Sequence, residues 1–165
     1  MLISRIENHQ YESNETINLG ELLTDLYEDL KDRMDEKELT FTMNLQYDFQ
    51  FIGNKTLIHI LLYNLMVNAI KYNKKNGSIT IIDGFLDSNY FLSVSDTGIG
   101  MNESQIDQIF NRFSRIDANE EGNGLGLAIA DSIALFHHII IEVTSKLDEG
   151  TTFRLRFPNN EKLNK

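Results

Sequence analysis

The chain of 165 residues carries 25 acidic and 15 basic side chains, and its formal net charge of −10 makes it a poor candidate for wrapping nucleic acid or anionic lipid. It has no cysteine, which excludes a disulfide framework, a thiolate metal site and a cysteine nucleophile. It also lacks an apolar run of about 18 or more residues and a secretory leader pattern, so we expect a globular domain without membrane contact of its own.

The first third of the chain predicts a helix fragment, a short strand and an amphipathic helix. Residues 1–8 resemble the end of a helix, and residues 15–18 have an extended pattern. Asn18 and Glu21 have the spacing of a capping box, and the apolar residues behind them recur at helical spacing. Acids cover the opposite side of this helix, which is most simply a solvated face. Residues 1–50 carry most of the excess charge, a net −8.

The rest of the chain mixes strands and helices without a regular βαβ repeat. The patterns predict strands at 39–45 and 48–52, a long helix at 54–73, a hairpin at 78–86 and 90–96, a short helix from Asn102 to about Phe110, a polar loop at 111–124, a helix at 125–136, and strands at 139–145 and 152–157. The helix at 54–73 is apolar on nearly every side, so we expect it to be buried. The order favours an α+β sandwich, with helices on one face of a sheet.

Polar residues interrupt the long apolar helix along one face. Asn64, Asn68, Lys71 and Tyr72 follow each other at helical spacing. Asparagine oxygens suit a hard cation such as Mg²⁺, and lysine suits phosphate. A solvent-facing stripe without a role explains these four residues equally well when they are taken alone.

Asp96 stands in phase with the apolar residues Tyr90, Leu92 and Val94, so its carboxylate should point to the buried side of its strand. An unpartnered buried carboxylate is costly and needs a donor, such as the exocyclic amine of a ligand. The glycines of segment 98–100 would let the backbone approach that ligand. Taken alone, an aspartate before glycine is more typical of a turn.

Two more glycine segments follow. Residues 122–127 read GNGLGL and precede a predicted helix. Backbone N–H groups at such a helix start form an anion site suited to phosphate. A flexible loop is the simpler alternative for this motif when it is taken alone. Residues 150–153 read GTTF, which by itself is a turn into the last strand.

In this order and spacing, the segments closely resemble the ATP-binding catalytic domain of bacterial sensor histidine kinases over residues 12–158, within the superfamily that includes the gyrase ATPase domain. NLMVNAIKYN resembles the N box, DTGIGM the first glycine box, IFNRFSRID the F box, GNGLGLAIA the second glycine box and GTTF the last one. The resemblance implies the Bergerat fold, a two-layer α/β sandwich whose mixed sheet is covered on one face by about three main helices. It also implies that a nucleotide lies between the long helix and a lid.

The same resemblance implies roles for individual residues. Asp96 would accept a hydrogen bond from the adenine amine and select ATP over GTP. Asn68, with Asn64 nearby, would hold Mg²⁺ between the phosphates, while Lys71 would contact phosphate and Tyr72 the adenosine. The implied nucleotide-binding set is completed by residues of the glycine segments, the lid and the last strand, namely Gly98, Ile99, Gly100, Met101, Phe113, Gly122, Gly124, Leu125, Gly126, Leu127 and Thr152. Thr152 would hydrogen-bond near the base.

Lid residues complete the implied site. Phe110 and Phe113 would anchor the lid, and Arg112 would reach the γ-phosphate. The lid, from about Asn111 to Asn123, is short for the family. The sequence also departs from the family pattern at Asp148, where a glycine is usual, and at His138, where a glycine-containing segment commonly follows the preceding histidine.

Asn64 bears on the choice between enzyme classes. Gyrase-like ATPases carry at this position a glutamate that activates the attacking water, and asparagine cannot take a proton. We therefore expect slow hydrolysis and a kinase that transfers the γ-phosphoryl group. The alternatives are another ATPase of the superfamily, a serine kinase of the anti-sigma type, and a non-catalytic nucleotide-binding or interaction module.

No histidine in the chain has the acid neighbour and hairpin context of the family's phosphate acceptor. We expect residues 1–11 to be the remnant of the second helix of a dimerisation hairpin and residues 12–165 to be the catalytic domain. The expected partners are ATP, the dimerisation helices of the same protein and a response regulator. The expected location is a cytoplasmic domain of a longer, membrane-anchored protein.

Overall fold

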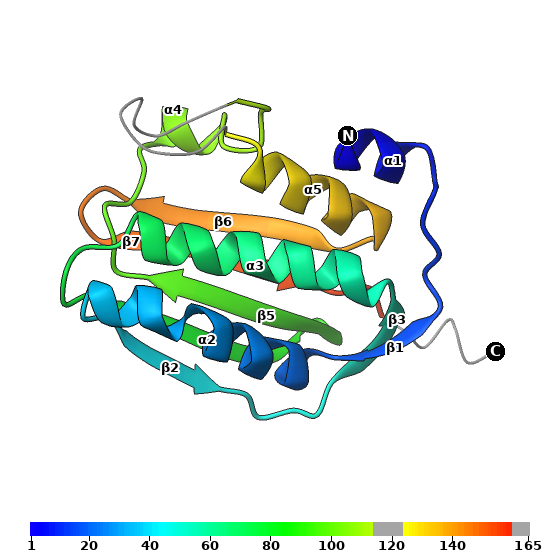
Figure 1. Cartoon of the computed structure of the whole chain (residues 1–165), viewed down its shortest axis with the longest axis horizontal. Coiled ribbons are helices and arrows are strands. Elements are labelled where there is room, and N and C mark those ends of the chain that lie inside the picture. Colours follow the sequence, from blue (N-terminus) through cyan, green and yellow to red (C-terminus); the bar gives the residue numbers. More distant parts are fainter. Residues whose placement is uncertain (114–123, 160–165) are drawn as a thin grey trace.

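A computed structural model describes residues 1–113 and 124–159 of the chain (Figure 1). The helices are α1 (Leu2–Glu7), α2 (Leu19–Glu36), α3 (Lys55–Lys71), α4 (Glu103–Ile106) and α5 (Gly126–Phe136). The strands are β1 (Glu15–Asn18), β2 (Thr40–Asn44), β3 (Gln50–Gly53), β4 (Ser78–Leu86), β5 (Asn89–Asp96), β6 (Ile140–Lys146) and β7 (Gly150–Arg156).

Five strands form the main sheet in the order β2-β4-β5-β7-β6, and β1 pairs with β3 in a separate two-stranded sheet. In the main sheet β2 and β4 run parallel, while the other neighbouring strands run antiparallel. The predicted mixed sheet is therefore confirmed. Its register sets Asp96, at the end of the central strand β5, opposite Ile79 on one side and Thr151 on the other.

Helices α2, α3 and α5 lie over one face of the sheet, as the α+β sandwich predicted (Figure 1). α3 is the middle helix and contacts both α2 and α5. Its Leu57, Leu61, Leu62 and Leu65 have no exposed surface, because neighbouring helices flank it and the sheet lies below it. This enclosure explains why the sequence of α3 is apolar on nearly every side.

The first helix packs beside α5 (Figure 1). Its Ile3 and Ile6 are buried, and Ile6 belongs to the same hydrophobic core as the rest of the described chain. Residues 1–11 thus contribute to this core.

Asparagine side chains cap the starts of three predicted helices, α2, α3 and α4. Asn18 Oδ1 accepts the Glu21 N–H at 3.1 Å at the start of α2, and Asn54 Oδ1 accepts the Leu57 N–H at 3.0 Å at the start of α3. Asn102 caps α4 as predicted, but α4 ends at Ile106, well before the predicted end near Phe110. Within residues 1–113 and 124–159, no helix combines the length and the apolar character that crossing a membrane requires.

Candidate functional site

The last turns of α3 carry the polar stripe that the sequence predicted. Asn64, Asn68, Lys71 and Tyr72 are all partly buried. The Asn64 side-chain N–H donates to the Ile60 carbonyl at 2.9 Å, so its amide oxygen is the atom that remains for other contacts. The stripe therefore presents oxygen atoms, a cation and a phenol from one helix.

The two carboxylate oxygens of Asp96, the last residue of β5, differ in their hydrogen bonds. Oδ1 accepts the backbone N–H of Gly98 at 2.8 Å and that of Thr151 at 3.3 Å. Among the residues that the structure describes, none donates to Oδ2. Burial raises the pKa of this carboxyl above its ordinary value, and the two backbone N–H groups oppose that shift to a smaller extent. The second oxygen can accept a hydrogen bond from a ligand.

The glycine segment after Asp96 lies directly against the end of α3. The Ile99 N–H donates to the Tyr72 carbonyl at 3.0 Å, and a Cβ on Gly98 would collide with that same carbonyl. Gly100 has a φ of +63°, a conformation that strains most side chains. Glycine at these two positions thus permits the close contact that sets Asp96 beside α3.

Together these elements enclose a small hollow. Its walls are formed by residues of α3, of the end of β5, of the glycine segment and of β7, namely Asn68, Tyr72, Asp96, Ile99, Gly100, Met101, Thr151 and Phe153. All of these except Thr151 and Phe153 were predicted to bind nucleotide. The hollow measures about 10 Å³, which holds about one water molecule. A purine ring can therefore enter only when the walls move apart.

The two threonines of β7 lie on opposite sides of the sheet. Thr151 lines the hollow, and its hydroxyl shares a 2.8 Å hydrogen bond with that of Ser145. Thr152, which was predicted to lie near the base, instead shares a 2.8 Å hydrogen bond with Ser95 and is not among the lining residues. Side chains alternate along a strand, so Thr151 lies on the same face as the buried Phe153, two residues later. This spacing was the sequence signal that could have identified Thr151 instead of Thr152.

The second glycine segment brings the start of α5 next to α3. Gly124, Leu125, Gly126 and Leu127 are described, whereas Gly122 lies outside the described residues. α5 begins at Gly126 without a side-chain cap, and a Cβ on Gly126 would lie 2.9 Å from Asn64 Oδ1. The first N–H groups of a helix and its dipole favour an anion, so the start of α5 offers a phosphate site beside the polar stripe.

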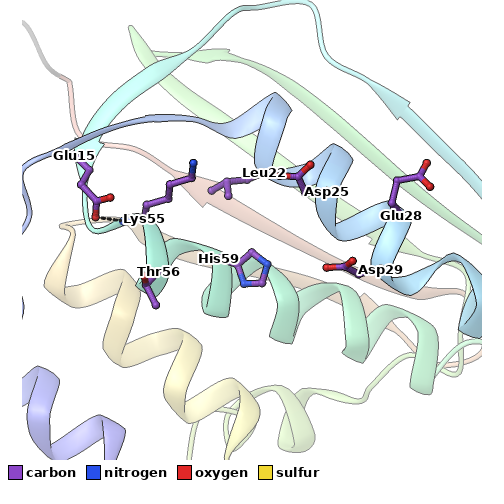
Figure 2. A pocket seen from close by; sticks show the side chains of 8 residues that line it. All are labelled: Glu15, Leu22, Asp25, Glu28, Asp29, Lys55, Thr56 and His59. Carbon is purple, nitrogen blue, oxygen red and sulfur yellow. Dashed lines mark hydrogen bonds between the residues drawn. The ribbon is translucent and has the colours of Figure 1, made fainter.

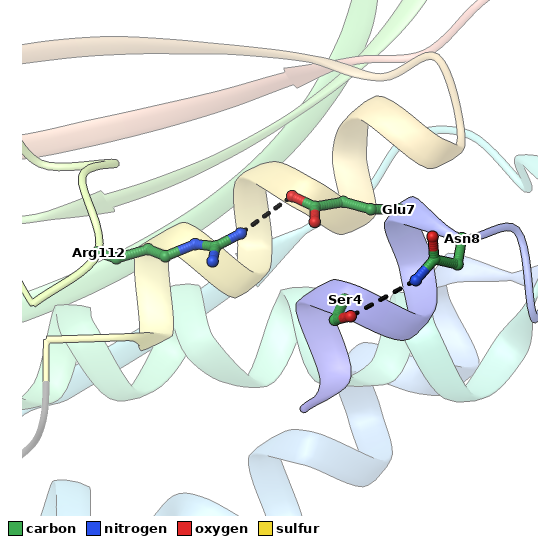
Figure 3. Close-up of polar contacts among 4 residues, drawn as sticks. All are labelled: Ser4, Glu7, Asn8 and Arg112. Atoms are coloured by element: carbon green, nitrogen blue, oxygen red, sulfur yellow. Dashed lines mark hydrogen bonds and ion pairs between the residues drawn. The ribbon is translucent and has the colours of Figure 1, made fainter.

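Arg112 forms an ion pair with the first helix. Its guanidinium is paired with the Glu7 carboxylate at 3.0 Å, across α5 (Figure 3). The two side chains are 46% and 58% exposed. An exposed pair of this kind contributes about 0–1 kcal/mol, so it opens readily. The predicted contact of Arg112 with a γ-phosphate requires that this pair first separates.

The two phenylalanines near Arg112 behave differently. Phe110 packs against the core, while the ring of Phe113 is 70% exposed. The Phe113 N–H donates to the Gly124 carbonyl at 3.0 Å, which joins the two ends of the segment 114–123. Of the two predicted anchors, Phe110 contacts the core through its ring, whereas Phe113 contacts Gly124 through its backbone.

The two departures from the family's glycine pattern both have left-handed backbone. Asp148 has a φ of +63° and His138 a φ of +57°. The Asp148 N–H donates to the Ile99 carbonyl at 2.8 Å, which holds this turn against the glycine segment. Aspartate and histidine adopt positive φ more often than most side chains do. The backbone at these positions is therefore the one that glycine would adopt.

His137 is buried and has a structural role. Its Nε2 accepts the Asn54 N–H at 3.0 Å, and its Nδ1 lies 2.8 Å from the Ile133 carbonyl. These partners require a neutral ring with its proton on Nδ1. Burial lowers the pKa of this imidazole. The ring thus fixes the start of α3.

A wider hollow, of about 630 Å³, lies between α2 and the start of α3 (Figure 2). Its lining contains four carboxylates and two groups that can carry positive charge, from Glu15, Leu22, Asp25, Glu28, Asp29, Lys55, Thr56 and His59. None of these residues was predicted to bind nucleotide, and the carboxylates would repel a triphosphate. Four acids of residues 1–50 therefore line this hollow, which shares no lining residue with the hollow at Asp96.

Comparisons with known proteins relate the chain to one family. The family model "Histidine kinase-, DNA gyrase B-, and HSP90-like ATPase" matches residues 53–161. The heme sensor protein HssS of Staphylococcus aureus (strain Newman) is 34% identical over 161 residues, which are 97% of this chain and 35% of that protein. The chain thus spans only about a third of the length of this curated relative.

Solved structures resemble the chain along most of its length. The catalytic domain of histidine kinase ThkA has a TM-score of 0.79 at 26% identity, covering 90% of this chain and 97% of that one. Full-length ShkA in complex with AMPPNP has a TM-score of 0.83 at 23% identity, covering 95% of this chain and 34% of that one. The latter likeness establishes a shared fold.

Proposed function

Because the chain belongs to the family of histidine kinase-, DNA gyrase B- and HSP90-like ATPases, we propose that it is the ATP-binding kinase domain of a sensor histidine kinase. In this proposal it binds Mg-ATP and transfers the γ-phosphoryl group to a histidine on dimerisation helices that lie outside this sequence. The phosphoryl group then passes to a response regulator.

The observation that carries the proposal is the Asp96 carboxylate at the hollow. Its Oδ1 is occupied by two backbone N–H groups, and its Oδ2 has no donor among the described residues. The adenine amine supplies such a donor. Guanine presents a carbonyl oxygen at the corresponding edge, so two acceptors would face each other and GTP would bind more weakly.

The residues of α3 fit a magnesium ion held together with phosphates. Mg²⁺ prefers oxygen ligands, and it commonly takes one or two from the protein and the rest from phosphates and water. Asn68 would hold the ion, with the Asn64 oxygen nearby. No group of three histidine, cysteine or acidic residues suited to a metal occurs in the described part of the chain. When bound, the ion would neutralise phosphate charge.

The remaining groups of the site would orient the triphosphate. The start of α5 would bind phosphate oxygens through its N–H groups, and Lys71 would contact them from α3. Arg112 would reach the γ-phosphate after leaving Glu7. Because Asn64 cannot remove a proton from water, hydrolysis would be slow and the phosphoryl group would be kept for the histidine.

We further propose that this domain works in the cytoplasm as part of a longer protein anchored in the membrane. The proposal is supported by HssS, which its name describes as a sensor and of which the matched region is 35%. In this proposal, the longer protein as a whole would determine which signal is sensed and which response regulator receives the phosphoryl group.

The test is a transfer assay with ATP labelled in its γ-phosphate. The chain is mixed with a fragment of the same protein that carries the helical hairpin with its acceptor histidine, and with the same fragment carrying alanine at that position. We expect label on the first fragment only, in a linkage that acid breaks and alkali does not. Release of inorganic phosphate faster than transfer would show an ATPase, and an alkali-sensitive linkage would show a serine kinase. ATP binding without transfer or hydrolysis, or no ATP binding at all, would show a non-catalytic module.

A further inference from the structure

Lys37, which follows the last residue of α2, extends its side chain to the C-terminal end of α3. Its ammonium group donates to the carbonyls of Ile70 at 2.9 Å, Lys71 at 2.7 Å and Asn73 at 3.3 Å. An ammonium has three donors and no acceptor, so this partly buried group uses its full hydrogen-bonding capacity on one helix end. No sequence pattern singles out this lysine.

The last carbonyls of a helix have no partner within the helix, and a cation is favoured beside them by the helix dipole. At the end of α3, the N–H groups of Tyr72 and Asn73 reach back to the carbonyls of Asn68 and Ile70. Lys37 supplies donors to the Lys71 and Asn73 carbonyls. The conformation of the chain where α3 ends therefore depends on a side chain that follows the end of α2.

This helix end joins two parts of the candidate site. It carries Lys71 and Tyr72 of the polar stripe, and the Tyr72 carbonyl accepts the Ile99 N–H of the glycine segment. The buried Asn73 extends the junction, because its side-chain N–H donates to the Ser78 carbonyl at 3.0 Å. A shift of this end would move the stripe relative to Asp96.

We propose that Lys37 is a positioning residue for nucleotide binding, which acts by holding the end of α3 in the conformation that sets Tyr72 against the glycine segment. Lys37 is not among the residues that line the hollow. The inference rests on the proposed function, since it concerns the site at which ATP would bind.

A purely structural role for Lys37 predicts a different result. In that case, loss of the ammonium lowers the melting temperature but leaves the affinity unchanged at temperatures where the variant is folded. If the ammonium positions the site, affinity falls even in the folded variant. If the last turn of α3 is in its binding-competent conformation only about a tenth of the time in the variant, the apparent affinity falls by that fraction. The dissociation constant of Mg-ATP then rises about tenfold.

The experiment compares Lys37→Met, which keeps the apolar stem, with Lys31→Met on the same helix. Lys31 is exposed and pairs with Glu28 at 3.1 Å, so it reports the effect of removing one surface cation. Titration calorimetry with Mg-ATP is performed well below the melting temperatures of both variants. Hydrogen exchange of the Ile99 amide is followed in parallel, because that N–H is bonded to the Tyr72 carbonyl.

We expect affinity to fall about tenfold and Ile99 exchange to accelerate in K37M, with both unchanged in K31M. Equal affinities of K37M and K31M, or unchanged exchange at Ile99, would overturn the inference while the proposed function stands. Failure of the unsubstituted chain to bind ATP would overturn the proposed function and the inference with it. Should K37M prove unfolded by circular dichroism, the same criteria apply to Lys37→Gln, whose side chain keeps a hydrogen-bond donor without the charge.

Discussion

Replacing Asp96 by asparagine separates ligand recognition from folding. The amide oxygen of the new side chain can still accept the two backbone N–H groups that now reach Oδ1, at 2.8 Å and 3.3 Å, so the local backbone should keep its conformation. The amide nitrogen takes the place of Oδ2 and faces the adenine amine with a donor. A hydrogen bond to a charged group is worth about 1.5–3 kcal/mol, so we expect the dissociation constant of ATP to rise about ten- to 150-fold.

The same substitution should not destabilise the chain at neutral pH. Burial raises the folded-state pKa of Asp96, so its contribution to stability is fully present below the unfolded-state pKa and is lost as pH rises through the folded value. At pH 7 the buried ionised carboxylate therefore lowers the free energy of unfolding, and asparagine, which carries no charge, removes this destabilisation. Thermal unfolding of D96N should show a melting temperature equal to or above that of the unsubstituted chain.

The assay is calorimetric titration of ATP and GTP, with Asp148→Asn as the matched control. Asp148 is exposed, and asparagine also adopts its positive φ readily, so D148N should bind ATP as the unsubstituted chain does. D96N should also narrow the preference for ATP, because its amide N–H can donate to guanine. An ATP affinity within about threefold of the unsubstituted value, or a parallel loss of affinity and stability, would refute the assignment of Asp96 to adenine.

Four further variants test other contacts. Asn68→Ala should remove most of the Mg²⁺ dependence of ATP binding; calorimetry with and without Mg²⁺ that shows the same dependence would exclude the metal role. Lowering the pH through 6.5, the ordinary pKa of histidine, should reduce stability because folding disfavours protonated His137, and His137→Gln should flatten this part of a melting-temperature profile. His138→Gly should raise the free energy of unfolding by about 0.5–1 kcal/mol in urea titrations, because glycine adopts this left-handed backbone conformation without the steric strain of a side chain. Glu7→Gln should change stability by less than about 1 kcal/mol and strengthen Mg-ATP binding by releasing Arg112; an unchanged affinity would show that the pair does not compete with nucleotide.

Much of the site was visible in the sequence because it depends on short-range patterns. Helical spacing places Asn64, Asn68, Lys71 and Tyr72 on one face of α3, and strand alternation directs Asp96 toward the helices. Both patterns hold whatever the helix and the strand pack against. The order and spacing of the glycine segments then identified the family and the mixed sheet.

Other parts of the site depend on contacts between distant segments. Arg112 lies beside Glu7, and Lys37 beside the end of α3, because of how whole helices pack rather than because of neighbouring residues. Thr151 rather than Thr152 reaches the hollow because the register of β7 sets it opposite Asp96. By itself the sequence determined the elements and their buried faces, since these follow from periodicity, and its resemblance to a known family implied the residues that would bind a nucleotide. Only the tertiary structure decided which charged groups meet across the fold, because an ion pair or a capped helix end forms only where packing brings its two partners within hydrogen-bond distance.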